Sequence, residues 1–206
     1  MKPAKKKILI VKIGAIGDAV MALSMIHEID KKYSDSKITW LCGSIISPLI
    51  KSVRQISEVI TLDENKLLSG SIIEQFVVVF TVWIKLFLRK FDLVINAHSD
   101  KRYNFLVFTT IKNEYKSFSG KNRKNQLVKG RYHAVEYARL IHGIDNWKMP
   151  EPVFPKIIPT QVNHIDELLG ELKNKKIILT PGGAQNIIND GIQRKWPTEN
   201  YSLLTK

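Results

Sequence analysis

The amino-acid sequence predicts an α/β fold built on a parallel sheet. From residue 7 to residue 143, apolar runs of strand length alternate with segments of helical period, which is typical of strands joined by crossover helices. The composition is that of a globular protein, with 44% hydrophobic and 25% charged residues. Prolines cluster near residue 150, and a new βα pattern begins after them. We therefore expect one complete domain in the 206 residues, followed by the start of a second.

Five apolar runs predict the strands of the first domain, because β-branched and aromatic residues favour strands. They are residues 7 to 13 (KILIVKI), 37 to 42 (KITWLC), 58 to 62 (EVITL), 92 to 97 (DLVINA) and 116 to 119 (KSFS). The single cysteine, Cys42, lies in the second run, so we expect a buried thiol and a reducing compartment.

Helices are predicted between these strands. The first covers roughly residues 18 to 33, where apolar residues recur along one face. The others are expected near 47 to 55, at 71 to 91, near 101 to 112, and at 133 to 143, where Gly143 closes the helix.

The run from 71 to 91 is the longest apolar stretch, but polar residues such as Glu74 and Lys85 interrupt it before it reaches the length that spans a bilayer. We expect a buried helix. The alternative is a basic amphipathic helix on a membrane surface, because Phe87 and Leu88 stand beside two cations. The N-terminus does not resemble a secretory signal, since Lys12 interrupts its apolar run.

The chain is predicted to divide into a domain at 1–148, a proline-rich linker at 149–161 and a second unit at 162–206. The second unit contains an expected helix (162 to 173), one strand (175 to 180) and a helix that opens at Pro197. One strand cannot bury its own faces, so we expect a truncated or split second domain.

The formal net charge of +13 favours an anionic partner, although lysines scattered over solvated faces give the same total. The denser cationic groups, at 5 to 7, 100 to 102 and 121 to 131, indicate an anion-binding surface.

The turn after the first strand carries Gly14, Gly17 and Asp18. Backbone N–H groups at such a helix start face the edge of the sheet where ligands bind. A dinucleotide-binding fingerprint is not present, because Lys12 stands where its first glycine is required. Asp18 therefore has two interpretations, as a helix cap or as a general base.

Several segments together resemble the heptosyltransferases of glycosyltransferase family 9, which are inverting enzymes of lipopolysaccharide core assembly. The resemblance covers nearly the whole chain in order. It rests on residues 8 to 41, on FDLVINAHSDKR (91 to 102), on YHAVEYARLIHGI (132 to 144), and on IILTPGGAQ (177 to 185) with RKWPTENYSLL (194 to 204). Ser24 departs from the family, which often has proline there.

This resemblance implies a GT-B fold, in which two Rossmann-like domains face each other across a cleft. It also implies a nucleotide-sugar donor, ADP-heptose, and no metal or cofactor. Asp18 matches the family's catalytic aspartate, and Lys195 matches a lysine that contacts the donor phosphates. Gly182 and Gly183 are expected to form a phosphate-facing turn beside Lys195.

The acceptor side is expected to use residues of the first domain. These candidates are Gly14, Gly17, His98, Lys101, Arg102 and His133, with Arg123, Lys124 and Arg131 as further cations that could meet acceptor carboxylates and phosphates. For His98 the alternative is local hydrogen bonding at a strand end, and for His133 it is a structural role at a helix start.

The resulting prediction is an inverting glycosyltransferase that moves heptose from ADP-heptose to the lipopolysaccharide inner core or a related acceptor. We expect this chain to be incomplete and inactive alone. The expected location is cytoplasmic, at the cytoplasmic face of the inner membrane, with peripheral membrane contact and no nucleic-acid partner. The alternative is a non-catalytic basic α/β module that binds an anionic glycolipid or nucleic acid.

Overall fold

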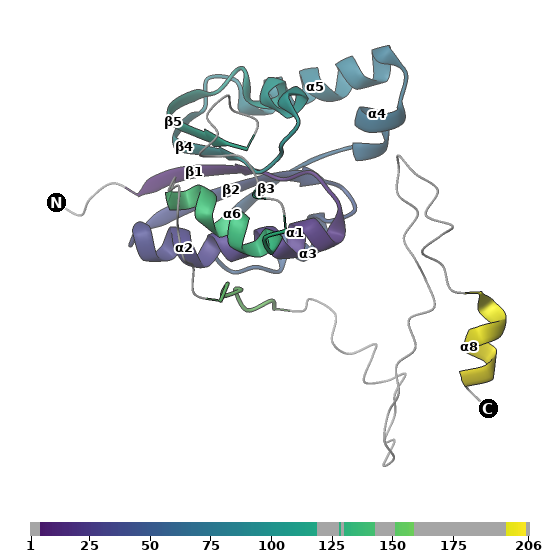
Figure 1. Cartoon of the computed structure of the whole chain (residues 1–206). Helices are drawn as coiled ribbons and strands as arrows, with labels where there is room; N and C mark the ends of the chain where they lie inside the picture. Colours follow the sequence, from purple (N-terminus) through teal and green to yellow (C-terminus); the bar gives the residue numbers. More distant parts are fainter. Residues whose placement is uncertain (1–4, 119–127, 129, 143–150, 159–196, 205–206) are drawn as a thin grey trace. The chain divides into compact units, whose positions relative to one another are not determined.

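The computed structural model describes residues 5–118, 128, 130–142, 151–158 and 197–204 (Figure 1). The chain divides into two compact units, Met1–Ile158 and Pro159–Lys206. In the second unit, the described element is helix α8 (Thr198–Leu204), which begins after Pro197 as predicted. The predicted helix at 162 to 173 and strand at 175 to 180 lie outside the described residues.

The first unit contains a five-stranded sheet in which all neighbouring strands are parallel, in the order β3-β2-β1-β4-β5. The predicted α/β fold with a parallel, Rossmann-like sheet is therefore confirmed for this unit. The strands are β1 (Lys6–Val11), β2 (Ser36–Gly43), β3 (Ile56–Leu62), β4 (Lys90–Asn96) and β5 (Ile111–Ser117). Strands β2 and β3 lie on one side of β1, and β4 and β5 lie on its other side. The direction in which the chain adds strands therefore reverses between β1 and β4.

Helices cover both faces of this sheet (Figure 1). Alternate residues of β1 point to opposite faces, so that Ile8 and Ile10 enter one apolar core while Leu9 and Val11 enter the other. The first core includes residues of α1 (Ile16–Ala22), α2 (Ser24–Lys32), α3 (Ser47–Lys51) and α6 (His133–His142). The second includes residues of α5 (Ile72–Leu86) and the 3₁₀-helix η1 (Lys101–Val107).

Several predicted elements differ from the structure. The helix expected at 18 to 33 is two helices, α1 and α2, which meet at Leu23. The helix expected near 101 to 112 is only η1, and β5 already begins at Ile111. The strand expected at 116 to 119 is β5, which begins five residues earlier, because five of its seven residues are exposed on this edge strand and need not be apolar.

A further difference is α5, which ends at Leu86 and was expected to be buried. Its buried residues are Val78, Val82 and Leu86, whereas its opposite face is exposed. No helix among the described residues combines the length and the apolar character needed to cross a bilayer. Cys42 is buried as predicted, and burial together with the charge of Glu64 raises the pKa of its thiol to about 12.

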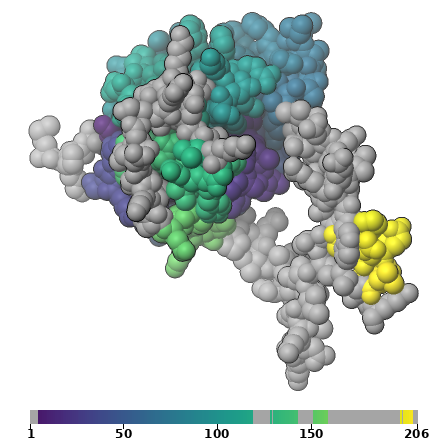
Figure 2. All heavy atoms as spheres, in the orientation of Figure 1, coloured from purple at the N-terminus to yellow at the C-terminus, as the bar shows by residue number. Residues whose placement is uncertain are grey.

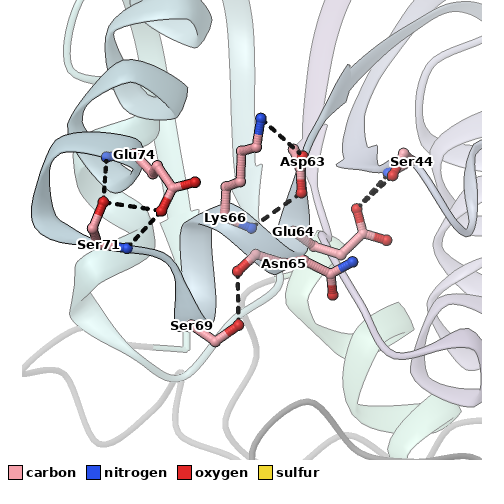
Figure 3. Close-up of polar contacts among 8 residues, drawn as sticks. All are labelled: Ser44, Asp63, Glu64, Asn65, Lys66, Ser69, Ser71 and Glu74. Atoms are coloured by element: carbon pink, nitrogen blue, oxygen red, sulfur yellow. Dashed lines mark hydrogen bonds and ion pairs between the residues drawn. The ribbon is translucent and has the colours of Figure 1, made fainter.

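The short helix α4 (Glu64–Ser69) was not predicted, and it connects β3 to α5 through side-chain caps (Figure 3). The carboxylate of Asp63 accepts from the backbone N–H of Lys66 at 3.1 Å. Glu64 is buried and accepts from the backbone N–H and hydroxyl of Ser44. Ser71 and Glu74 then form a reciprocal capping box that starts α5.

Polar contacts fix the beginning of helix α6 over the first core. The buried Ser24 hydroxyl donates to the carbonyl of Ala134 at 2.7 Å and so joins α2 to the start of α6. Glu136 is buried and pairs with Arg139 at 2.7 Å and with Arg131 at 3.2 Å. These contacts hold the part of α6 that carries Tyr137.

We predict that Glu136→Gln destabilises the first unit by about 3 kcal/mol, because the buried Arg139 guanidinium would lose the carboxylate charge that faces it. The free energy of unfolding in urea measures the effect. Asp35→Asn is the matched control, since it removes the carboxylate of an exposed Lys5–Asp35 pair and is expected to cost less than about 1 kcal/mol. Equal effects of the two substitutions would contradict the prediction.

Candidate active site

The candidate site lies at the carboxyl ends of β1 and β4, where the strand order switches. In an open parallel sheet this is the position at which a crevice forms between diverging connections. Gly14, Gly17 and Asp18 follow β1, and His98 follows β4. The topology therefore brings together two segments that are about 80 residues apart in the sequence.

Asp18 is held by an ion pair with Lys12. The Lys12 ammonium lies 3.0 Å from Asp18 Oδ2, and the two side chains are 5% and 40% exposed. Ala15 stands at the N-cap of α1, and Asp18 makes no capping hydrogen bond. Asp18 therefore does not cap α1 through a hydrogen bond, although it lies in the first turn of that helix, and Lys12 fixes its carboxylate while one side remains open to solvent.

Lys12 was not among the predicted site residues, although a lysine inside an otherwise apolar strand run was a usable signal. Burial lowers the pKa of its ammonium, and the neighbouring Asp18 carboxylate opposes that shift. The ammonium also lies 5.4 Å from the centroid of the Tyr137 ring, which α6 carries. Burial, with the charge of Asp18, raises the pKa of the Tyr137 phenol, so this hydroxyl stays protonated at neutral pH.

His98 joins the two segments of the site. Its Nε2 accepts a hydrogen bond from the backbone N–H of Ile13 at 2.9 Å, which assigns the ring proton to Nδ1. The ring stacks on Tyr103 with 3.8 Å between centroids. Burial and the charge of Lys12 lower the pKa of His98 well below its ordinary value, against the opposing charge of Asp100. This geometry favours the local hydrogen-bonding role of His98 over a contact with the acceptor.

The remaining predicted residues of the first unit surround this centre or follow it in the chain. A Cβ atom at Gly14 or Gly17 would meet no atom within 4 Å, so both face open space. His133 is exposed at the start of α6, one helical turn before Tyr137. Lys101 and Arg102 are exposed at the start of η1.

Two of the predicted cations are engaged within the protein. The Arg102 guanidinium lies 2.7 Å from the Asp100 carboxylate, which lowers the pKa of Asp100. Arg131 pairs with the buried Glu136, so its guanidinium supports α6. The other predicted residues, Lys195, Gly182, Gly183, Arg123 and Lys124, lie outside the described residues.

The arrangement provides an oriented carboxylate, a buried cation and a neutral phenol at one open edge of the sheet. A carboxylate in this position can accept a proton from a hydroxyl group that enters from the side of Gly14 and Gly17. Within the described ranges, no three side chains of His, Cys, Asp or Glu gather in a way that could hold a metal ion.

We predict that His98 makes the first unit sensitive to acid. An unfolded histidine has a pKa near 6.5, whereas the pKa of folded His98 is lower, so the unfolded state binds more protons below about pH 6.5. The free energy of unfolding should therefore fall by up to about 1.4 kcal/mol per pH unit from this residue. Urea unfolding between about pH 7.5 and pH 5 measures the slope.

His98→Gln is expected to remove this component, because its amide oxygen can still accept from Ile13 without titrating. The control is His133→Gln at an exposed position, which should keep the wild-type slope. An unchanged slope in the His98 variant would contradict the prediction.

The sequence comparison finds a relative among characterised proteins, although no family model matches the chain. The lipopolysaccharide core heptosyltransferase OpsX of Haemophilus influenzae is 26% identical over 123 residues, which cover 60% of this chain and 33% of OpsX.

Solved structures share the fold. The Escherichia coli heptosyltransferase WaaC with ADP aligns with a TM-score of 0.57 and 16% identity, over 72% of this chain and 50% of WaaC. E. coli ADP-heptose lipopolysaccharide heptosyltransferase II (TM-score 0.52, 13% identity) is covered over 48% of its length. A glycosyltransferase family 9 protein of Veillonella parvula (TM-score 0.52, 18% identity) is covered over 42%.

The chain thus spans a third of the curated relative and about half of these solved structures. The sequence similarity, the shared fold and the glycine turn with its fixed aspartate agree with one another. They confirm the resemblance that the sequence motifs predicted: the chain is similar in sequence and fold to heptosyltransferases of glycosyltransferase family 9.

Proposed function

We propose that the first unit binds the acceptor of an inverting glycosyl transfer, in which heptose moves from ADP-heptose to the lipopolysaccharide inner core or a related glycan. The observation that carries this proposal is the Asp18 carboxylate, oriented by the buried Lys12 at the topological switch point. The similarity to OpsX supports the lipopolysaccharide acceptor. The relatedness to WaaC, solved with ADP and with ADP-2-deoxy-2-fluoro heptose, supports the donor.

In this proposal, Asp18 accepts the proton of the acceptor hydroxyl while its oxygen attacks the anomeric carbon of the donor. The bond between that carbon and the diphosphate oxygen breaks, and ADP leaves with the electron pair. Lys12 holds Asp18 by one carboxylate oxygen, so the exposed part of the side chain can meet the acceptor. Positioning of the hydroxyl at this carboxylate supplies part of the rate.

The donor side of the proposal lies in the second unit. Lys195 would offset the charge that develops on the departing diphosphate, with Gly182 and Gly183 in the phosphate-facing turn. The proposed division is an acceptor domain at 1–148, a linker at 149–161 and the beginning of a nucleotide-sugar domain at 162–206. A glycolipid acceptor would place the protein at the cytoplasmic face of the inner membrane.

We predict that Asp18→Asn lowers the rate of heptose transfer at least about 100-fold, because the amide cannot take the hydroxyl proton. The rate of ADP release from ADP-heptose is measured in a form of the protein that includes a donor-binding domain. Asp30→Asn, at an exposed position of α2, is the matched control and should keep the wild-type rate. If the Asp18 variant also kept that rate, Asp18 would be only the ion-pair partner of Lys12.

The 206-residue chain itself permits a binding test. We predict saturable binding of a phosphorylated inner-core oligosaccharide that weakens with salt, because the acceptor is anionic and the chain carries a net charge of +13. Isothermal titration calorimetry measures the dissociation constant. A generic single-stranded RNA is titrated in the same way for comparison. Equally tight binding of the RNA would favour the alternative of a non-catalytic basic module over the glycosyltransferase.

A further inference from the structure

The outer face of α5 is apolar along its whole length. Ile73, Phe76, Val77, Phe80 and Ile84 recur at the spacing of one helical face, and Phe87 continues that face beyond the helix end. These six residues, called the α5 surface below, are between 49% and 77% exposed. The rings of Phe76 and Phe80 stack at 6.0 Å. Figure 2 shows the α4 and α5 segment, in blue, at the surface of the first unit.

This surface is unusual because α5 already packs on the sheet through its opposite side. Val78, Val82 and Leu86 form that buried stripe and contribute to the second core. A helix with one core-facing stripe ordinarily presents charged residues to water on the other face. At 15 residues, α5 is about 22 Å long, which is shorter than the roughly 30 Å hydrocarbon core of a bilayer. It therefore cannot cross a membrane, but it can lie along one.

Aromatic residues and a cavity extend the apolar area beside α5. Trp83 donates its indole N–H to the carbonyl of Phe105 and contacts the exposed ring of Phe108 at 5.8 Å between centroids. A cavity of about 360 Å³ lies between α4, α5 and η1, and its lining includes Phe76, Trp83 and the exposed Arg102. Arg102 is paired with Asp100, so the cavity offers mainly apolar surface, which suits an acyl chain.

The charges around the α5 surface favour an anionic partner. Lys85 on the flank of α5 and Lys90 just beyond its end are both exposed. The only acidic residue of α5, Glu74, is committed to the capping box with Ser71 (Figure 3). A symmetric dimer through this face would bring the same cations of two copies together, which costs free energy. An anionic surface would instead neutralise them.

We propose that the α5 surface docks the protein on a bilayer that contains anionic phospholipids, with Phe76, Phe80 and Ile84 entering the interface and Lys85 and Lys90 facing the headgroups. This inference specifies the membrane contact within the proposed function. It is tested by lipid binding alone, with neither donor nor acceptor present, so its failure would leave the transfer reaction untouched.

The test is flotation of the 206-residue chain with phosphatidylcholine vesicles that contain or lack phosphatidylglycerol. The wild type is expected to bind the anionic vesicles at least ten-fold more tightly than the neutral ones, and to release them in high salt. Phe80→Asp combined with Ile84→Asp should lower binding at least ten-fold, with an unchanged urea midpoint because both side chains are exposed.

Two further variants test whether the position of the new charge and the lysines matter. Ile45→Asp places the same charge at another exposed apolar position and should bind as the wild type does. Lys85→Glu with Lys90→Glu should weaken binding to anionic vesicles only. Wild-type binding by the Phe80 and Ile84 variant, or no binding of the wild type to either vesicle, would overturn the proposal. A wild-type dimer that these aspartates dissociate, without vesicle binding, would assign the face to a second copy instead.

Discussion

The ion pair between Lys12 and Asp18 is the constraint around which the candidate site is organised. Removing an ammonium group from water costs several kcal/mol unless a partner compensates it. Here the compensation comes from the Asp18 carboxylate at 3.0 Å and from the face of the Tyr137 ring at 5.4 Å. Because Lys12 follows β1 directly, this requirement places the first turn of α1 and the middle of α6 against the same strand end. The positions of Asp18, the proposed base, and of Tyr137 thus both follow from the burial of the Lys12 ammonium.

The rest of the first unit keeps these partners in place. The hydroxyl of Ser24 and the buried Glu136 hold the beginning of α6, while Lys32 and Lys116 both donate to the carbonyl of Ile141 near its end. On the other side, His98 ties the segment after β4 to the backbone of Ile13. Helix α6 is held at both ends, and the segment after β1 is held by His98. The surroundings of Asp18 are therefore fixed. Such preorganisation is what a proton transfer to a weak base requires.

Much of the fold follows from the sequence, because a strand buried on both faces of a parallel sheet leaves a nearly continuous apolar run. The runs beginning at 7, 37 and 92 correspond to β1, β2 and β4 for this reason, and the run beginning at 58 corresponds to β3, an edge strand with two buried residues. The edge strand β5 was placed too late and too short, since its exposed residues need not be apolar. Helix α4 carries no apolar period and depends on side-chain caps. The outer face of α5 was wrongly expected to be buried, because the sequence pattern does not distinguish a buried apolar residue from an exposed one.

The sequence by itself determined the parallel α/β architecture and the glycine turn, and it indicated Asp18 as the candidate base, since local periodicity and motif spacing are properties of the chain. Only the tertiary structure decided how these residues act. It left Asp18 without a capping hydrogen bond, paired it with Lys12, brought Tyr137 over that pair from more than 100 residues away, and turned His98 into a structural acceptor. These outcomes depend on burial and on contacts between distant segments, which strand pairing and helix packing create and which no local pattern contains.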